Sequence, residues 1–197
     1  MTALTLASKS PVRAQLLWSA GVPFETAGSG VNEEALKTEL LAQKASPSKI
    51  AEALAAAKAL AVAWERDGLI IGADSTIEFE GALVDKAQSM TEARERLQAM
   101  RGKEHLLHSA VVVARANDLL FHHLDTARMT MRDFSDAWLD EYLQRQGEAI
   151  LGSVGCYQLE GEGVQMFDAI DGDYFTILGL PMLGLLDFLR RQKVIAA

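Results

Sequence analysis

The clearest strand in the sequence is Leu69-Ile70-Ile71-Gly72-Ala73-Asp74-Ser75-Thr76-Ile77-Glu78-Phe79, an apolar run that Asp74 interrupts. The small residues directly before the aspartate allow another backbone or a ligand to approach closely. A carboxylate in an apolar strand is costly to bury without a partner. Asp74 is therefore expected to be paired, to bind a metal or to act in catalysis, and a purely structural carboxylate is the alternative.

Strand and helix signals alternate on both sides of this segment. Further strands are expected over residues 4–6, 24–27, 104–115, 121–131 and 164–170. Helices are expected from Pro11 to about residue 20, from a Ser46 cap to about residue 64, from a Thr91 cap to about residue 100, from a Ser135 cap to about residue 146, and from Pro181 to about residue 192. This alternation predicts an α/β fold, and the length of 197 residues fits one domain over residues 1–197.

Composition narrows the class of partner. The net charge of −8 argues against a protein that binds nucleic-acid polymers, which usually presents a basic face. Any phosphate ligand must then meet a local cluster of cations. The single cysteine, Cys156, excludes an intrachain disulfide and is expected to be a small, half-buried side chain. No leader-like segment and no apolar run of spanning length is evident, so we expect no membrane association and a place in the cytoplasm.

A candidate anion site follows the first strand, at Ser8-Lys9-Ser10-Pro11-Val12-Arg13. The free N–H groups and the positive dipole end of a helix that begins at Pro11 suit an anion. Ser8 and Ser10 add hydroxyls, and Arg13, one turn into the helix, can reach back to a phosphate bidentately. The alternative is that Ser10 is only an N-cap and that the cations are solvated.

Four more charged residues stand out. Glu33 and Glu34 follow a Gly-rich stretch, where they can bind Mg²⁺ or Mn²⁺ through oxygen or can simply be favourable charges in the first turn of a helix. Lys58 interrupts an Ala-rich helix, and Lys86 follows a short apolar segment. Both lysines can equally extend their ammonium groups to solvent.

Several common templates are missing from the sequence. The four histidines lack the spacing of a zinc site, and His122 and His123 are expected on opposite faces of a strand. There is no GxxxxGK[ST], GxGxxG or GxSxG motif, which argues against the usual kinase, dinucleotide-binding and hydrolase templates.

Taken in order, these motifs resemble the Maf family of nucleotide pyrophosphatases. The family's Ser-x-Ser-Pro-Arg-Arg loop corresponds to residues 8–13, its Val-Asp-Glu to residues 31–33, its helical lysine to Lys58 and its Gly-Ala-Asp-Thr to residues 72–75. Its Gly-Lys-Pro corresponds to residues 85–87, its Ser-Gly-Lys-x-His to residues 101–105 and its Gly-Leu-Pro to residues 179–181. Each motif is weak alone, but their order and spacing together are specific and extend from about residue 4 to residue 189.

The resemblance implies an elongated, two-lobed mixed sheet flanked by helices, with a central cleft and often a homodimer. It implies hydrolysis of a nucleoside triphosphate to the monophosphate and pyrophosphate. Asp74 would be the general base, and Glu33 with Asp74 would hold a divalent metal, Mg²⁺ or Mn²⁺. The substrate would be bound by Ser8, Ser10, Arg13, Lys58, Ser75 and Lys86.

The chain departs from the family pattern at residues that bear on the choice of base. Val12 replaces an arginine, Ser75 a threonine, and Glu160 stands where many relatives have glutamine. A carboxylate at Glu160 can accept hydrogen bonds from the N1–H and exocyclic amine of guanine and favours a positively charged base, so 7-methyl-GTP is the expected substrate over dTTP and UTP. Asn32 replaces an aspartate and Ala87 a proline. Val12 and Asn32 mildly favour the alternative, a catalytically weak nucleotide-binding regulator of cell division.

Overall fold

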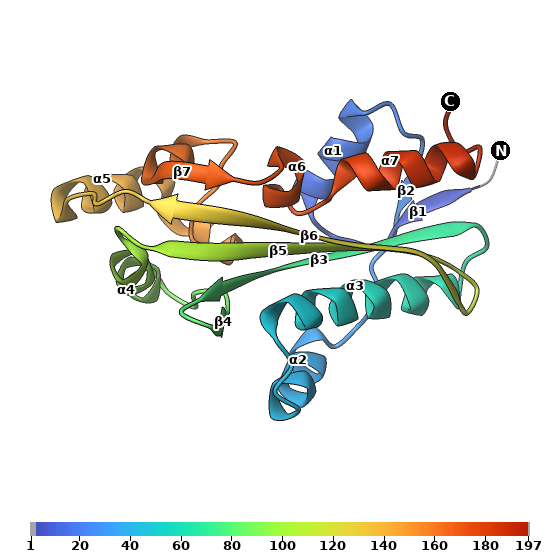
Figure 1. The fold of residues 1–197 in the computed structure, drawn as a ribbon, viewed down its shortest axis with the longest axis horizontal. Coiled ribbons are helices and arrows are strands. Elements are labelled where there is room, and N and C mark those ends of the chain that lie inside the picture. Colours follow the sequence, from blue (N-terminus) through green and yellow to red (C-terminus); the bar gives the residue numbers. More distant parts are fainter. Residues whose placement is uncertain (1–2, 197) are drawn as a thin grey trace.

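Within residues 3–196, which the computed structural model describes, one mixed sheet of seven strands extends along the molecule (Figure 1). Its order is β2-β1-β3-β5-β6-β7, and β4 also pairs with β3. The strands are β1 (Leu4–Leu6), β2 (Glu25–Thr26), β3 (Leu69–Phe79), β4 (Ala82–Val84), β5 (Glu104–Arg115), β6 (Asp118–Met131) and β7 (Phe167–Asp171). β1 is parallel to β2 and β3, and all other pairs are antiparallel.

The pairing of β3 leaves an opening in the sheet. One edge of β3 pairs with β5 from Ile70 to Glu78. The other edge pairs with β1 over residues 69–71 and with β4 over residues 77–79. In the described part of the chain, no strand pairs with that edge over residues 72–76. The segment that contains Asp74 therefore borders a gap between β1 and β4.

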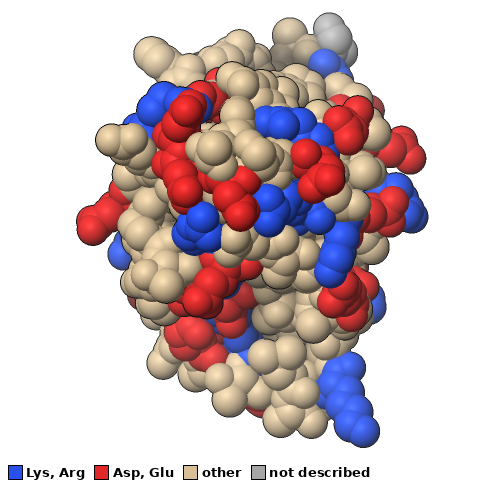
Figure 2. All heavy atoms as spheres, turned by 90° about the vertical axis from the view of Figure 1, so that its left-hand side faces the viewer, with Lys and Arg blue, Asp and Glu red and all other residues tan. Residues whose placement is uncertain are grey.

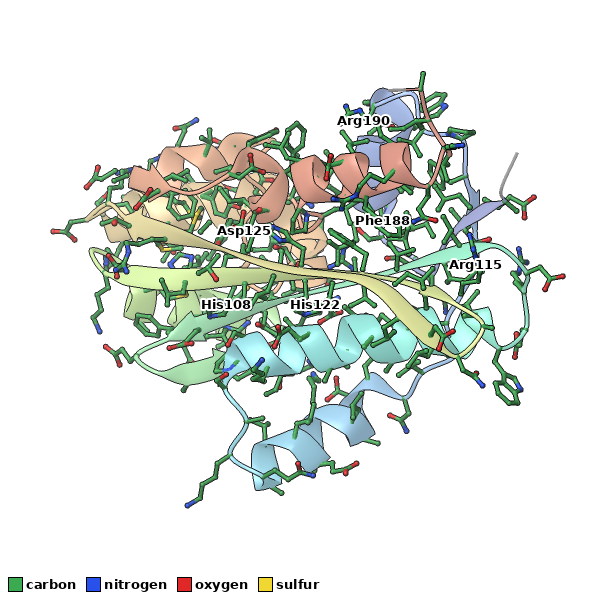
Figure 3. The ribbon with its side chains drawn as sticks, turned by 45° about the vertical axis from the view of Figure 1, so that its right-hand side comes forward. His108, Arg115, His122, Asp125, Phe188 and Arg190 are labelled. Carbon is green, nitrogen blue, oxygen red and sulfur yellow. The ribbon has the colours of Figure 1, made fainter. Side chains whose placement is uncertain are left out.

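Helices cover both faces of the sheet. α3 (Pro47–Ala63) lies on one face with α2 (Glu33–Ala42) outside it, and α1 (Pro11–Ser19), α6 (Tyr174–Ile177) and α7 (Met182–Arg191) lie on the other (Figure 1). Strand alternation directs β6 side chains to these two layers. His122 pairs with Glu52 of α3, whereas Asp125 accepts a hydrogen bond from Thr176 of α6 (Figure 3). His123 stacks on Phe121 on the α7 side, so the two neighbouring histidines do face opposite ways.

The far end of the long β5–β6 hairpin forms a second lobe. α4 (Met90–Met100), α5 (Asp136–Gln146) and two 3-10 helices, η1 (Gly147–Gly152) and η2 (Glu162–Met166), surround it together with β7. A separate hydrophobic core, which includes Leu97, Met129 and Tyr142, fills this lobe. The other lobe has one core under α1 and α7 and another under α3. The predicted two-lobed α/β fold with a mixed sheet is confirmed.

α3 packs unusually close to β3. Its buried stripe includes Leu54, Lys58 and Val62, spaced by four residues. A Cβ on Gly72 would overlap the carbonyl oxygen of Ala55, so only a glycine on β3 allows this approach. Gly72 thus allows the backbone of α3 to approach β3 closely, and this approach places Lys58 directly over the strand.

Most predicted elements agree with the structure, and three boundaries differ. Ser89, not Thr91, caps α4, because its Oγ accepts a hydrogen bond from the Glu92 N–H. β7 begins at Phe167 rather than at residue 164, because η2 occupies residues 162–166. β6 begins at residue 118, three residues earlier than predicted.

Other features were not predicted at all. The short elements β4 and α6 were missed, and so was the extent of α2 beyond its acidic first turn. Cys156 is fully buried rather than half-buried. Among the described residues, none of the helices is both long and apolar enough to cross a membrane.

Candidate active site

A cavity of about 1070 Å³ lies between the two lobes, at the open edge of β3. Its volume is large enough for a nucleotide. All nine residues that the sequence singled out line it, namely Ser8, Ser10, Arg13, Glu33, Lys58, Asp74, Ser75, Lys86 and Glu160. They come from elements between residue 8 and residue 160, and the fold brings them into one place.

The centre of the cavity contains two carboxylates that share one ammonium group. Lys58 Nζ lies 2.5 Å from Oδ1 of Asp74 and 3.0 Å from Oε2 of Glu33. The side chains of Lys58 and Asp74 are almost buried, whereas Glu33 is half-exposed in the first turn of α2. The alternative in which Lys58 extends to solvent is therefore wrong. Glu33 lies in the first turn of α2, as the helix-start interpretation predicted, and it also faces Asp74 across Lys58, while its role as a metal ligand stays a prediction.

Arg13 joins three segments around the phosphate loop (residues 8–13). Its Nε donates to the Gly179 carbonyl oxygen at 2.7 Å, its Nη1 to Ala73 O at 3.0 Å and Ser8 Oγ at 3.4 Å, and its Nη2 to Ser75 Oγ at 3.1 Å. Because a guanidinium has five N–H donors, one N–H on Nη2 has no partner among residues 3–196. Burial lowers the pKa of Arg13, and the charges of Asp74 and Glu33 oppose that shift.

The phosphate loop is ordered by its own hydroxyls. Ser10 Oγ caps α1 by accepting from the Arg13 N–H, as the N-cap interpretation predicted. Ser8 Oγ accepts from the Ser10 N–H at 3.2 Å. Two exposed lysines that line the cavity, Lys9 and Lys86, form no ion pair within the described residues, in contrast to Lys58. They are the cations most available to a phosphate.

The loop that carries Lys86 is fixed from several sides. Lys37 of α2 pairs with the Asp85 carboxylate at 2.5 Å, and the Asp85 carbonyl oxygen accepts from Arg96 of α4. The amide of Gln88 donates to the Lys86 carbonyl oxygen at 3.1 Å. Lys86 therefore extends from a backbone that is held on both sides.

The segment of residues 153–160 forms another part of the cavity wall. Tyr157 lines it, and its hydroxyl shares a hydrogen bond of 2.7 Å with Nε2 of the buried His105. Burial lowers the pKa of His105 to about 4 and raises that of Tyr157, so both groups are neutral at pH 7. Glu160 is exposed at the cavity wall and has no ion-pair partner in residues 3–196.

Two carboxylates of the cavity, Glu33 and Asp74, are the candidate ligands of a divalent metal. Glu33 and Asp74 both reach the single position that Lys58 Nζ occupies, so they can act on one cation together. In the described part of the chain, no group of three His, Cys, Asp or Glu residues is arranged to hold a metal. Two carboxylates suit Mg²⁺, which is commonly bound by one or two carboxylates, substrate phosphates and water. The two carboxylates alone would therefore fit Mg²⁺ only where other oxygen ligands, such as phosphate or water, complete its coordination.

Some residues of the site were not found from the sequence. Tyr157, Asp85 and Lys37 line the cavity, and Gly179 supplies a carbonyl to Arg13. Gly179 has a φ of 93°, and an added Cβ would lie 3.1 Å from Ser75 Oγ. Its place in a Gly-Leu-Pro motif was the available signal for a special backbone position.

The charges on the surface are mixed. On the face of Figure 2, basic and acidic side chains are interspersed and no extended basic patch is seen.

Comparisons with known proteins agree with this geometry. The family of Maf-like proteins matches residues 3–192. The chain is 56% identical to a nucleoside triphosphate pyrophosphatase of Caulobacter vibrioides over 190 residues, 96% of each chain. It is 48% identical to a 7-methyl-GTP pyrophosphatase of Rhizobium meliloti over 195 residues, 98% of each chain, and 47% identical over 193 residues to one of Brucella suis, covering 98% of this chain and 97% of the relative. With cavity, motifs and sequence in agreement over nearly its whole length, the chain belongs to the Maf family.

Proposed function

We propose that this chain hydrolyses nucleoside triphosphates between the α and β phosphates and releases the monophosphate and pyrophosphate. The observation that carries the proposal is the pair of carboxylates on Lys58, beside the phosphate loop in a nucleotide-sized cavity. Relatives at 45–56% identity are named nucleoside triphosphate pyrophosphatase or 7-methyl-GTP pyrophosphatase. Their names favour an enzyme over a binding regulator.

Asp74 is the general base in this proposal. Its carboxylate takes a proton from the water that attacks phosphorus, a contribution worth roughly 10²–10⁴ in rate. Lys58 fixes one carboxylate oxygen, Oδ1, while Oδ2 has no hydrogen-bond partner within residues 3–196. Asp74 can therefore be oriented through one oxygen and accept the proton through the other.

Glu33 and Asp74 would hold the divalent metal, Mg²⁺ or Mn²⁺, which supplies stabilisation of the charge on the phosphate oxygens. Ser8, Ser10, the remaining N–H of Arg13, Lys58 and Lys86 bind the triphosphate. Ser75 acts mainly through Arg13, because its Oγ accepts a hydrogen bond from Arg13 Nη2. The cations provide the local positive field that a chain of net charge −8 needs to bind a polyanion.

The test of the reaction is pyrophosphate release from a panel of nucleotides with Mg²⁺ or Mn²⁺. The panel contains 7-methyl-GTP, GTP, dTTP, UTP and ATP. Release of pyrophosphate together with the nucleoside monophosphate is expected from at least one member. If nucleotide binds but the wild-type protein releases no pyrophosphate from any member with either metal, the regulator alternative replaces the enzyme.

For the base, we propose a preference for 7-methyl-GTP over dTTP and UTP. Glu160 supports this preference, because a carboxylate at the cavity wall accepts hydrogen bonds from guanine and attracts a positively charged base. The same carboxylate repels the O4 oxygen of thymine or uracil. Two relatives named 7-methyl-GTP pyrophosphatase, at 48% and 47% identity, also favour it. The relative at 56% identity has the broader name.

The preference is tested with Glu160→Gln, which keeps the shape and removes the charge. The kcat/KM ratio of 7-methyl-GTP to UTP is expected to fall by about 10-fold or more, the value of a hydrogen bond to a charged group. The exposed Glu148, outside the cavity, provides the matched control Glu148→Gln. Faster turnover of UTP and dTTP than of 7-methyl-GTP by the wild type would overturn the preference and leave the reaction intact.

A further inference from the structure

Arg96 of α4 bridges two loops that both line the cavity, although it does not itself line the cavity. Its Nη1 donates to the carbonyl oxygen of Asp85 and, at 2.8 Å, to that of Val154. Its Nη2 pairs with Glu92 at 3.0 Å, and its side chain is only 12% exposed. A single guanidinium thus holds the backbones of two segments that are about 70 residues apart in the sequence.

Each of these loops carries a different part of the proposed site. The residue after Asp85 is Lys86, a cation with no ion-pair partner in the described chain. The segment after Val154 carries Tyr157 and Glu160, which line the end assigned to the base. Arg96 therefore connects the backbone at the phosphate end with the backbone at the base end.

Two neighbours of Arg96 strengthen this connection. Glu92, its partner on α4, also accepts from the backbone N–H of Gln88 at 2.8 Å, so the Lys86 loop is held on both sides of the lysine. Cys156 is fully buried beside the guanidinium. Burial raises the pKa of its thiol, while the charge of Arg96 and the backbone N–H of Ala87 oppose that rise. The thiol therefore lies where the segment of residues 153–160 meets the backbone next to Lys86.

We propose that Arg96 is a positioning residue that sets the distance between the phosphate-binding and base-binding ends, and so makes triphosphate binding by Lys86 depend on a correctly seated base. The inference rests on the proposed nucleotide hydrolysis. A guanidinium suits this task because its planar fork can serve two carbonyls and a carboxylate at once. Without it, two carbonyl oxygens lose their donor and the two loops move independently.

Loss of this bridge has a signature that differs from loss of a phosphate ligand. A nucleotide uses both ends of the cavity, whereas inorganic tripolyphosphate uses only one. Arg96→Gln should therefore weaken nucleotide binding more than tripolyphosphate binding. Lys86→Met should weaken both by a similar factor, because it removes a charge from the end that the two ligands share.

The experiment measures KM and kcat for 7-methyl-GTP and UTP and the inhibition constant of tripolyphosphate, in wild type, Arg96→Gln, Arg96→Lys and Lys86→Met. For Arg96→Gln we expect kcat/KM on the better nucleotide to fall by about 10-fold or more. The inhibition constant of tripolyphosphate should rise less than about threefold, and discrimination between the two nucleotides should shrink. Arg96→Lys keeps the charge without the fork and should be intermediate.

Arg94 is the matched control, since it lies two residues away on α4 and pairs with Asp140 at 2.8 Å, outside the cavity. Arg94→Gln should behave as wild type. If both Arg96 variants keep the wild-type ratio of nucleotide to tripolyphosphate affinity, the positioning role is wrong. Should Arg96→Gln fail to fold, the ratio in Arg96→Lys decides. A wild type that hydrolyses no nucleotide would instead overturn the proposed function itself.

Discussion

The ammonium group of Lys58 lies 2.5 Å from the Asp74 carboxylate, inside the contact between α3 and β3. It also reaches Glu33 at 3.0 Å, so one cation balances both carboxylates assigned to the metal. A metal ion that enters this position competes with Lys58 for the same oxygens. In the proposed function, triphosphate oxygens would offer the ammonium group another partner, which would link the arrival of substrate to the availability of the carboxylates.

The first prediction concerns Lys58→Met. Removing the competing ammonium leaves two close carboxylates, so Mn²⁺ should bind the nucleotide-free protein at least about 10-fold more tightly, given the strength of a partly buried charge pair. Electron paramagnetic resonance of free Mn²⁺ measures the affinity. The control is Lys49→Met on the same helix, where the lysine pairs with Glu52 away from the cavity. Unchanged Mn²⁺ affinity in Lys58→Met would show that Lys58 does not compete.

The second prediction concerns the general base. Asp74→Asn keeps the shape of the side chain but cannot take a proton, so kcat should fall by roughly 10²-fold or more. Nucleotide binding should persist, because Lys86 and the phosphate loop are untouched. Pyrophosphate release and equilibrium binding are measured on the same preparation, with the exposed Asp187→Asn as control. An unaffected rate would remove Asp74 from its assigned role.

The sequence was sufficient to find the centre of the site. Asp74 stood out as a carboxylate in an apolar strand. The burial of Lys58 could also have been predicted, since Leu54, Lys58 and Val62 follow one face of a helix at four-residue spacing. That periodicity favours a buried Lys58 over a solvated one.

The remaining parts of the site depend on contacts between distant segments. Arg96 lies in a helix rich in charged residues, where an arginine ordinarily marks a solvated surface, so no local pattern distinguishes it from Arg94. The hydrogen bonds of Arg13 to Gly179 and Ser75 could not be predicted either, because these partners are 166 and 62 residues away in the sequence. β4 was missed because three residues after a turn carry almost no periodic signal.

The third prediction concerns Gly72, where α3 approaches the strand. Gly72→Ala would bring a Cβ into the carbonyl oxygen of Ala55 and within 2.6 Å of the Ala59 nitrogen. Overpacking of this kind costs about 1–3 kcal/mol, and a contact with rigid backbone should lie at the upper end or beyond. Urea unfolding measures the loss in free energy.

The matched variant is Gly184→Ala in α7, where the nearest atoms to an added Cβ are 3.6 Å away. Because alanine is the better helix former, this change should be neutral or stabilise by up to about 1 kcal/mol. Equal effects of the two substitutions on the free energy of unfolding would contradict the close packing of α3 on β3.

The fourth prediction concerns pH and the buried His105. Its pKa in the folded protein is about 4, below the ordinary value near 6.5, because burial disfavours the charged ring. Between pH 4 and pH 6.5, His105 is therefore neutral in the folded protein and takes up a proton on unfolding. The stability that this group contributes is fully present above pH 6.5 and is lost as the pH falls toward 4. From pH 7 to pH 5 the loss is about 2 kcal/mol.

Other groups also titrate in this range, so the comparison that isolates His105 is a difference between variants. His105→Gln cannot be protonated and keeps a polar group for the Tyr157 hydroxyl. Its free energy of unfolding should be lower than that of the wild type at pH 7. On going to pH 5, it should fall by about 2 kcal/mol less than that of the wild type. His123→Gln, which changes a half-exposed histidine, should follow the wild-type dependence. If the free energy of unfolding of His105→Gln falls as steeply with pH as that of the wild type, the buried imidazole is not the group that takes up the proton.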